Sequence, residues 1–268
     1  MQEDIIQLLE RYDLRVLSSR LEVDPTNMSD LSIVFSHESY QNFEAHLFTI
    51  ADACGWYPHL LHSGDVEVLC SVLPDESQKA ICRFTDATRE LMLQLQRYRE
   101  RIALGEIPSF IWAHHEFRWH RFDWDSAKWG SLPSEDYLQY VDSSIRSHIL
   151  RLNELGFVTK ESCSGLPEEH TDRDPYWPYI MFEERAYPGI APHLFTLSDI
   201  ALWDAKYAPH NFDVYLKAPR GVATLDSFCN LVNCATGLYR HLHEHSQKVT
   251  TVNLSSLTWR MKSYSVEK

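Results

Sequence analysis

The sequence predicts an α+β protein: a mixed or antiparallel sheet with helices packed on one face, plus a small N-terminal β-α-β module. Two observations predict this class. A helix with an apolar stripe lies between two short strands early in the chain, and the second half has the order helix, three strands, helix, strand. The 268 residues are 44% hydrophobic and 24% charged, as is usual for a chain that buries a core.

The N-terminal module begins with a helix over residues 2–12, where isoleucines and leucines recur on one side. A strand is expected at 31–35 and a helix at 38–53. Gly55 is placed to end that helix in the left-handed conformation. A second strand follows at 65–73, where apolar and polar residues alternate.

A third helix is expected over residues 86–104, and Gly105 and Pro108 end it. We place a domain boundary here, between an N-terminal α/β module at 1–106 and a C-terminal α+β domain at 107–268. No linker rich in Gly or Ser marks the boundary. The sequence predicts no internal repeat.

The C-terminal domain is expected to contain a helix over 136–155, with apolar residues at helical spacing and a glycine cap at Gly156. A strand is expected at 157–159, and the motif at 159–165 follows it. The later elements are predicted as strands at 178–182 and 212–217, a helix at 224–245, and terminal strands at 248–254 and 257–266.

Residues 110–129 are unusually rich in aromatic side chains, interleaved with His and Arg. We favour a rigid aromatic core beneath a loop. The alternative is a platform on which a planar ligand or a nucleic-acid base stacks.

The net charge of −13 argues against a general nucleic-acid binder, because acidic chains repel phosphates. From residue 211 onward, however, the chain has seven Lys and Arg but only four Asp and Glu. A local basic surface is therefore an alternative for this segment. The acidic N-terminus and the lack of a long apolar run predict a cytoplasmic protein with no membrane contact. Six cysteines without Cys-x-x-Cys spacing indicate reduced, mostly buried thiols.

Two groups of candidate metal ligands are weighed against simpler explanations. His241 and His245 share a helix face, as a metal site requires, but the stabilisation of positive charge at a helix C-terminus explains them better, and we favour that explanation. Glu168, Glu169 and His170, with Asp172 and Asp174, form an acidic loop that we expect to be solvated, or less favourably to act as a lid. Neither group predicts a metal site.

The sharpest chemical feature is the stretch Thr159-Lys-Glu-Ser-Cys-Ser-Gly165. Small hydroxyl residues and a glycine after a strand can present consecutive amides to an anion. Cys163 needs a basic neighbour to act as a nucleophile, and the sequence shows Lys160 but no obvious partner histidine. Local composition alone favours a tight turn with a buried thiol. Glycine motifs of nucleotide-binding folds and the hydrolase Gly-x-Ser-x-Gly are absent.

Taken as one block, residues 122–183 resemble the core of the tRNA wybutosine-synthesising methyltransferases (TYW3 type). The resemblance lies in Trp129-Gly130-Ser131, in Val141-Asp142, and in Ser162-Cys163-Ser164-Gly165. It implies an α+β fold and methylation of a modified tRNA guanosine with S-adenosylmethionine. Leu166 stands where that family has arginine.

On this analogy the catalytic residues would be Asp142, Ser162, Cys163 and Ser164. The cofactor-binding residues would be Thr159, Gly165, Trp129, Gly130 and Ser131. We therefore expect a small ligand or nucleotide-type cofactor, S-adenosylmethionine among them, in a cleft at 159–165. The alternative is a non-catalytic regulatory or interaction protein that retains the scaffold. The negative net charge disfavours tRNA as a partner. Assembly into a homo-oligomer is compatible with the sequence.

Overall fold

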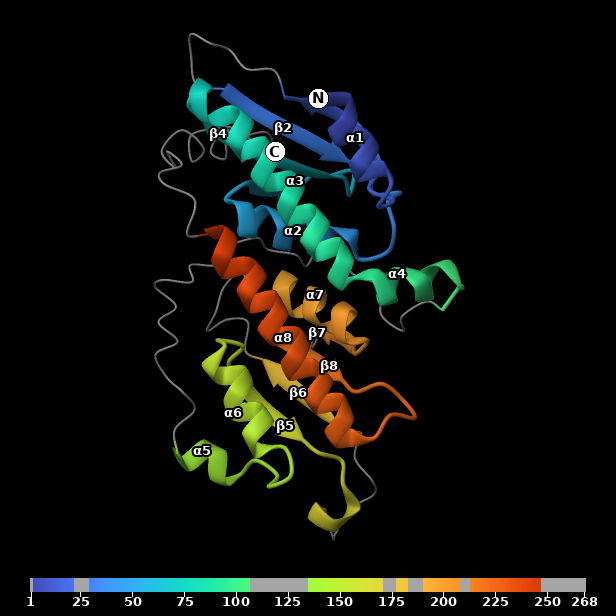
Figure 1. The fold of residues 1–268 in the computed structure, drawn as a ribbon. Helices are drawn as coiled ribbons and strands as arrows, with labels where there is room; N and C mark the ends of the chain where they lie inside the picture. The colour runs from blue at the N-terminus through green and yellow to red at the C-terminus, as the bar shows by residue number, and fades with distance from the viewer. Residues whose placement is uncertain are drawn as a thin grey trace. The chain divides into compact units, whose positions relative to one another are not determined.

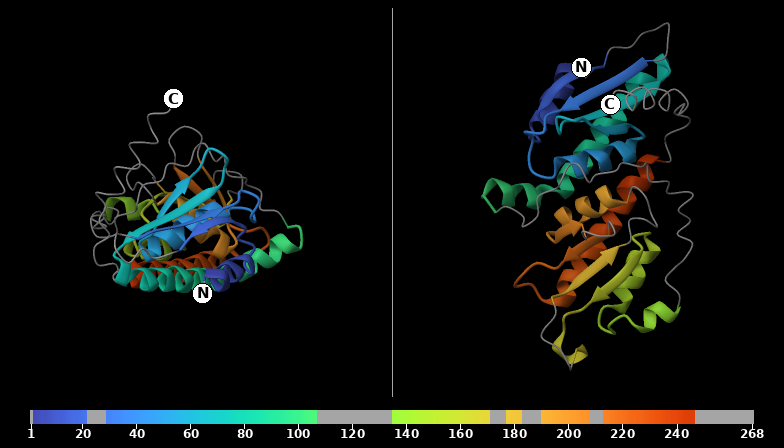
Figure 2. Two further views of the ribbon diagram at one scale, coloured as in Figure 1. Left: turned by 90° about the horizontal axis from the view of Figure 1, so that it is seen from above. Right: turned by 180° about the vertical axis from the view of Figure 1, so that it is seen from behind.

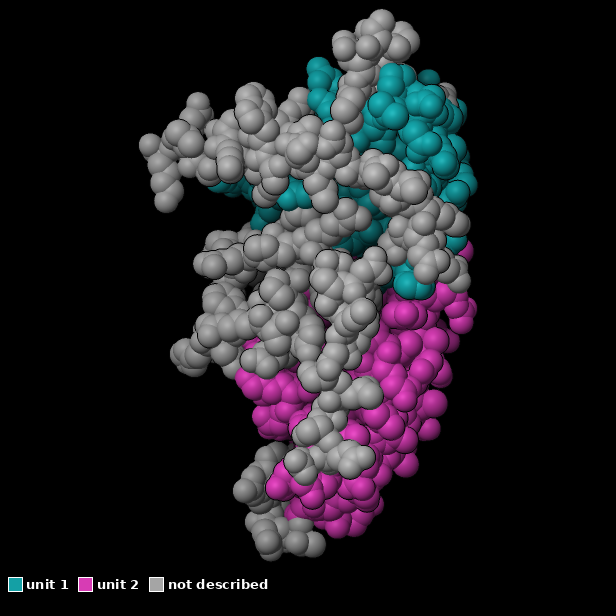
Figure 3. Space-filling view, turned by 90° about the vertical axis from the view of Figure 1, so that its left-hand side faces the viewer, with its two compact units in different colours: residues 1–92, 241–268 teal, residues 93–240 magenta. Residues whose placement is uncertain are grey.

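The computed structural model describes residues 2–21, 29–106, 135–170, 177–182, 190–207 and 213–246. It confirms the α+β class, with helices and two antiparallel sheets of four strands each in the described part of the chain (Figure 1). The chain divides into two compact units, one of residues 1–92 with 241–268 and one of residues 93–240 (Figure 3). The sequence had placed a boundary between residues 106 and 107.

The first unit is built on a sheet with the strand order β1-β2-β4-β3. Its elements are α1 (Gln2–Glu10), β1 (Val16–Arg20), β2 (Ser29–Phe35), α2 (Phe43–Cys54), β3 (Tyr57–Leu60), β4 (Val66–Val72), a 3₁₀ turn (Pro74–Glu76) and α3 (Ser77–Gln94). The predicted β-α-β module forms its centre, as β2, α2 and β4. The sequence missed β1 and β3, because short edge strands carry little alternation.

The second unit has a sheet with the strand order β5-β6-β8-β7. Its elements are α4 (Gln96–Ala103), α5 (Glu135–Gln139), α6 (Arg146–Glu154), β5 (Thr159–Cys163), a 3₁₀ turn (Pro167–Glu169), β6 (Tyr179–Phe182), α7 (Ala191–Ala201), β7 (Asp204–Tyr207), β8 (Val214–Lys217) and most of α8 (Thr224–Ser246). The sequence missed α7 and β7. The aromatic stretch 110–129 and the predicted strands 248–254 and 257–266 lie outside the described residues.

Two predicted helices are wrong in their extent. The helix expected at 86–104 is instead α3 and α4, and α3 begins at Ser77 and ends at Gln94. The helix expected at 136–155 is instead α5 and α6, with residues 140–145 between them. That connecting segment carries Asp142, and its serines bind a carboxylate from another part of the unit. Apolar spacing continues across it because Val141 and Ile145 are both buried.

The two units repeat one topology, so the prediction of no internal repeat is wrong. Each has a helix, two strands, a helix, two strands and a helix in chain order, and each sheet joins these strands in the same way. The first strand of each sheet has an irregularity at the same place, between Val16 and Ser18 in β1 and between Thr159 and Glu161 in β5. From α6 onward the second unit therefore follows the plan of the first, and α4 and α5 precede the repeated part.

A short sequence signature marks the repeat. His-Leu-Phe-Thr occurs at 46–49 in α2 and at 193–196 in α7. Asp52 and Trp56 follow it in the first unit, and Asp199 and Trp203 follow it at the same spacing in the second. The histidine, threonine, aspartate and tryptophan are buried in both units. Because they are buried in both units, we assign these shared residues to the packing of the common fold.

Each sheet packs its helices against one face. In the second unit the core face carries Ile180, Phe182, Val214 and Leu216, which are buried. The alternate residues of the same strands point to the opposite, outward face and are half-exposed. For the second unit, Figure 1 shows α6 and α8 in front of the sheet, and the view from behind in Figure 2 looks onto its outward face. No helix in the described ranges is long and apolar enough to cross a membrane.

Candidate functional site on the second sheet

The outward face of the second sheet combines aromatic and charged side chains. The strand pairing places Tyr179, Lys217 and Asp204 in one row across β6, β8 and β7. The next row contains Met181, Tyr215 and Lys206. Paired residues on neighbouring antiparallel strands point to the same side, so these six side chains share one surface.

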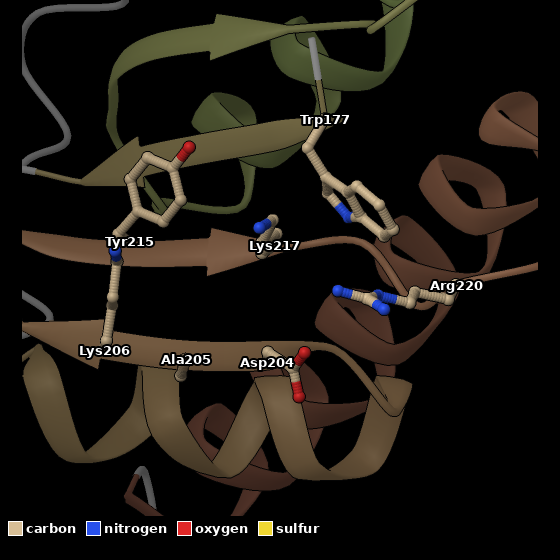
Figure 4. A pocket seen from close by; sticks show the side chains of 7 residues that line it. All are labelled: Trp177, Asp204, Ala205, Lys206, Tyr215, Lys217 and Arg220. Carbon is tan, nitrogen blue, oxygen red and sulfur yellow. The ribbon is translucent and has the colours of Figure 1, made fainter. Parts of the chain in front are cut away.

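A cavity of about 380 Å³ lies on this face. It is lined by Trp177, Asp204, Ala205, Lys206, Tyr215, Lys217 and Arg220 (Figure 4). Its volume falls in the range of small-molecule sites. The lining comes from β7, β8 and the segments that flank β6 and β8, so a regular sheet holds the residues in place.

Two cations share one aromatic ring in this cavity. The Lys217 Nζ lies 4.8 Å from the centre of the Trp177 ring, and the Arg220 guanidinium carbon lies 5.0 Å from it. The Trp177 indole is fixed by its own hydrogen bond, because Nε1 donates to the Ala218 carbonyl at 2.8 Å. The Lys206 Nζ lies 5.1 Å from the Tyr215 ring. Cation–π contacts of this length hold the charges in place.

Tyr215 continues into a second aromatic contact. Its ring stacks on that of Tyr179 at 4.8 Å and 21°. Burial, followed by the negative charges of Cys163 and Glu161, raises the pKa of Tyr215 to about 12. Burial and a hydrogen bond to Glu161 also raise the pKa of Tyr179. Both hydroxyls therefore stay protonated at neutral pH.

A cluster of three chemically different side chains lies where β5 ends. The Cys163 Sγ and the Asp142 Oδ2 are each 3.2 Å from the His170 Nε2. All three atoms lie within 4.8 Å of one another. Cys163 is buried, while Asp142 and His170 are partly exposed. Asp142 comes from the segment between α5 and α6, and His170 follows the 3₁₀ turn after β5.

Glu169 ties these segments together. Its carboxylate accepts hydrogen bonds from the hydroxyls of Ser143, Ser144 and Ser164 at 2.6 to 2.7 Å, and from the Ser144 amide at 3.0 Å. Burial alone would raise the pKa of Glu169, but these bonds to the charged form outweigh it and lower the pKa to about 2. The carboxylate is therefore charged throughout the neutral range.

The surroundings of Cys163 do not activate it as a nucleophile. Burial raises the pKa of the thiol, and the charges of Asp142, Glu161 and Glu169 raise it further, while the Gly165 amide opposes them. One imidazole nitrogen, Nε2, faces both the thiol and the Asp142 carboxylate. A catalytic triad instead uses the two ring nitrogens of histidine for the two partners.

The residues that the resemblance singled out fall into three groups. Asp142, Cys163 and Ser164 come together, since the Ser164 amide donates to Asp142 Oδ2 at 2.6 Å. Gly165 lies beside them with a φ of +67°, and its amide donates to Cys163 Sγ at 3.3 Å. Trp129, Gly130 and Ser131 lie outside the described residues.

Thr159 and Ser162 point elsewhere. Thr159 is buried against Asn153, which accepts a hydrogen bond from its amide and donates one to its hydroxyl, both at 2.9 Å. It therefore fastens α6 to β5. Ser162 pairs with the buried Ile180 and so lies on the other side of the sheet from Cys163. The stretch 159–163 is a strand, and the predicted tight turn is limited to the residues after Cys163.

Sequence reasoning missed several residues of the cluster around Cys163 and of the cavity. Glu169 and His170 were expected in a solvated loop, which is wrong: both are partly buried and make specific contacts. Asp172 and Asp174 lie outside the described residues. The pocket residues Lys217 and Arg220 belong to the basic excess after residue 211, which was the one signal available for them.

The other candidates have ordinary roles. His241 is buried, with its Nδ1 3.3 Å from Glu90 Oε2, and the side chain of His245 lies outside the described part. All six cysteines are free. Cys54, Cys70 and Cys163 are buried, whereas Cys82 and Cys229 are exposed.

No protein-family model matches the chain, and searches of curated proteins and of solved structures found no match. The resemblance to the wybutosine-synthesising methyltransferases therefore stays a prediction.

Proposed function

We propose that the second unit binds a small anionic ligand with a planar ring, of the nucleotide type, in the cavity beside Trp177. The observation that carries the proposal is that Lys217 Nζ and the Arg220 guanidinium carbon lie 4.8 and 5.0 Å from the centre of the same Trp177 ring. Two fixed cations at one end of a cavity are suited to phosphate oxygens.

The charges in the cavity support an anionic ligand. Three cations, Lys206, Lys217 and Arg220, line it, against one carboxylate, Asp204. Within the described ranges, none of the three cations forms an ion pair with a carboxylate. This local excess of positive charge stands out in a chain whose net charge is −13. A concave positive surface raises the local concentration of anions.

The aromatic side chains support a planar group on the same ligand. Trp177 and Tyr215 both line the cavity, and Tyr215 is held by its stack on Tyr179. Aromatic side chains with fixed orientation provide stacking surfaces for bases. The combination of ring and charge matches a nucleotide better than an inorganic anion.

The first unit provides an internal comparison. By strand pairing, the positions of Asp204, Lys206, Tyr215 and Lys217 correspond to Tyr57, His59, Glu67 and Leu69. The buried His, Thr, Asp and Trp recur in both units, but this set of lysines does not. The basic surface is therefore a property of the second unit alone and is not required by the scaffold.

The proposal is one of binding and contains no chemical step, so it also suits a non-catalytic regulatory protein. The methyltransferase version adds S-adenosylmethionine as the ligand. That cofactor carries a sulfonium cation, which a pocket with three cations disfavours. We therefore rank a phosphate-bearing ligand first.

Isothermal titration calorimetry tests the proposal with four probes: ADP, adenosine, pyrophosphate and S-adenosylmethionine. We expect ADP to bind more tightly than either adenosine or pyrophosphate, and its affinity to fall as salt is added. Absence of ADP binding at millimolar concentration contradicts the proposal. Tighter binding of S-adenosylmethionine than of ADP would favour the methyltransferase version instead.

A further inference from the structure

The cluster of Asp142, Cys163 and His170 is separate from the cavity and needs its own explanation. Its three side chains come from three segments of the second unit and direct a sulfur, a nitrogen and an oxygen toward one another. The three segments are the connection between α5 and α6, the end of β5, and the residue after the 3₁₀ turn. Thiolate, imidazole and carboxylate are the ligand types that divalent transition metal ions use in proteins.

The surrounding hydrogen bonds hold these ligands in position. The Ser164 amide donates to Asp142 Oδ2, and the Gly165 amide donates to Cys163 Sγ. Glu169 then binds serines on both sides of the cluster: Ser143 and Ser144 next to Asp142, and Ser164 next to Cys163. Support of this kind is what orients the ligands of metal sites.

We propose that Asp142, Cys163 and His170 bind a divalent transition metal ion of the zinc class. Thiolate and imidazole select such ions over magnesium or calcium, which prefer oxygen ligands alone. Three protein ligands leave the fourth position of a tetrahedral ion for water or for a bound molecule.

The two separations from His170 Nε2 suit this class of ion. Bonds of about 2.3 Å to sulfur and about 2.0 Å to nitrogen or oxygen place tetrahedral ligands roughly 3.3 to 3.6 Å apart. The 3.2 Å separations from His170 Nε2 to Cys163 Sγ and to Asp142 Oδ2 need only a small expansion to reach this range.

The site belongs to the second repeat alone. The strand pairing places Arg20 of β1 at the position of Cys163 in β5. A cation cannot serve as a ligand, so the first unit lacks the sulfur ligand. The sulfur ligand, like the lysines of the cavity, therefore occurs in the second unit and not at the matching position of the first, although the two units have the same fold.

Cobalt(II) titration of the full chain, freed of metal with a chelator, tests the proposal. We expect one equivalent of cobalt to produce a thiolate-to-cobalt charge-transfer band and the visible bands of tetrahedral cobalt. Cys163→Ser should abolish the charge-transfer band, and Asp142→Asn and His170→Asn should each weaken cobalt binding at least about tenfold. The exposed Cys229→Ser in the same unit should leave the spectrum unchanged.

No charge-transfer band in the wild-type chain, or an undiminished band in Cys163→Ser, overturns the proposal. Circular dichroism confirms that each variant is folded. The second observable is zinc content: the wild-type protein, incubated with zinc and dialysed, should retain one equivalent, and Cys163→Ser should retain none. Arg220→Gln should keep the cobalt spectrum, which separates this test from that of the nucleotide cavity.

Discussion

Trp56 and Trp203 occupy the same place in the two repeats. Each follows a buried helix by one left-handed residue, and each backbone amide donates to the carbonyl five residues earlier, Ala51 or Ser198, at 2.8 Å. Each indole then packs on a phenylalanine of the last helix of its repeat, Phe84 at 4.7 Å or Phe228 at 5.3 Å. The helix end and the tryptophan are thus one structural unit used twice.

The residue before each tryptophan gives the first prediction. Gly55 has a φ of +75° at this position, where any other residue except Asn is strained. Gly55→Ala should lower the free energy of unfolding by about 1 to 2 kcal/mol. Chemical denaturation of the variant measures the change.

Gly237→Ala is the matched control. Gly237 lies inside α8, where alanine is favoured over glycine by about 1 kcal/mol. A Cβ there would come 3.3 Å from Gln94 Oε1, the end of a flexible side chain that can move aside. The free energy of unfolding should therefore rise. A fall of equal size in both variants would contradict this account of the helix end.

Lys160 and Asp213 give the second prediction. The Lys160 Nζ lies 2.8 Å from Asp213 Oδ2, and the Asp213 side chain is only 1% exposed. Lys160→Met removes a positive charge beside a buried carboxylate and should cost about 2 to 3 kcal/mol of unfolding free energy. The half-exposed Arg151 pairs with an exposed Glu154, so Arg151→Met should cost less than about 1 kcal/mol. Equal losses from the two variants would contradict the assignment.

Glu44 gives a prediction about pH. Burial raises its pKa to about 7, although a backbone hydrogen bond and His37 oppose the shift. The folded state then binds a proton more tightly than the unfolded state, so stability falls as pH rises between about 4.5 and 7. Glu44→Gln should remove a loss of roughly 3 kcal/mol across that window, measured by denaturation at several pH values. The exposed Glu10→Gln should leave the pH dependence intact.

Glu169 gives a prediction about the metal site, as a positioning residue. Glu169→Gln weakens the bonds that hold Asp142 and Cys163 in place, so cobalt affinity should fall by about tenfold. The thiolate-to-cobalt band should persist at saturation, because the three ligands are unchanged. Loss of the band at saturating cobalt would contradict the positioning role.

The sequence predicted the elements whose signals are local. The α2 helix and its end at Gly55 were found because an apolar run and a glycine cap lie next to each other in the chain. All residues of α7 are buried, as are those of α2, but α7 ends at Leu202 instead of a glycine, so the sequence carries no cap signal for it. The repeat was missed because the shared residues are few and concentrated around His46 and His193.

The candidate site was only partly predictable. The resemblance pointed to Asp142, Cys163 and Ser164, which the fold brings together. No periodicity connects Cys163 to His170, because a 3₁₀ turn reverses the chain between them. The pocket depends on strand register, which pairs Tyr179 with Lys217 and which composition does not specify.

The nucleotide cavity is tested by measuring the affinity for ADP of three proteins: the wild-type chain, Arg220→Gln and Arg151→Gln. Arg220 lies against the Trp177 ring in the cavity, whereas Arg151 is an exposed arginine on α6 of the same unit. The account predicts that Arg220→Gln weakens ADP binding by about tenfold or more and that Arg151→Gln leaves it unchanged. Equal affinity in all three proteins, or no binding to any of them, would contradict it.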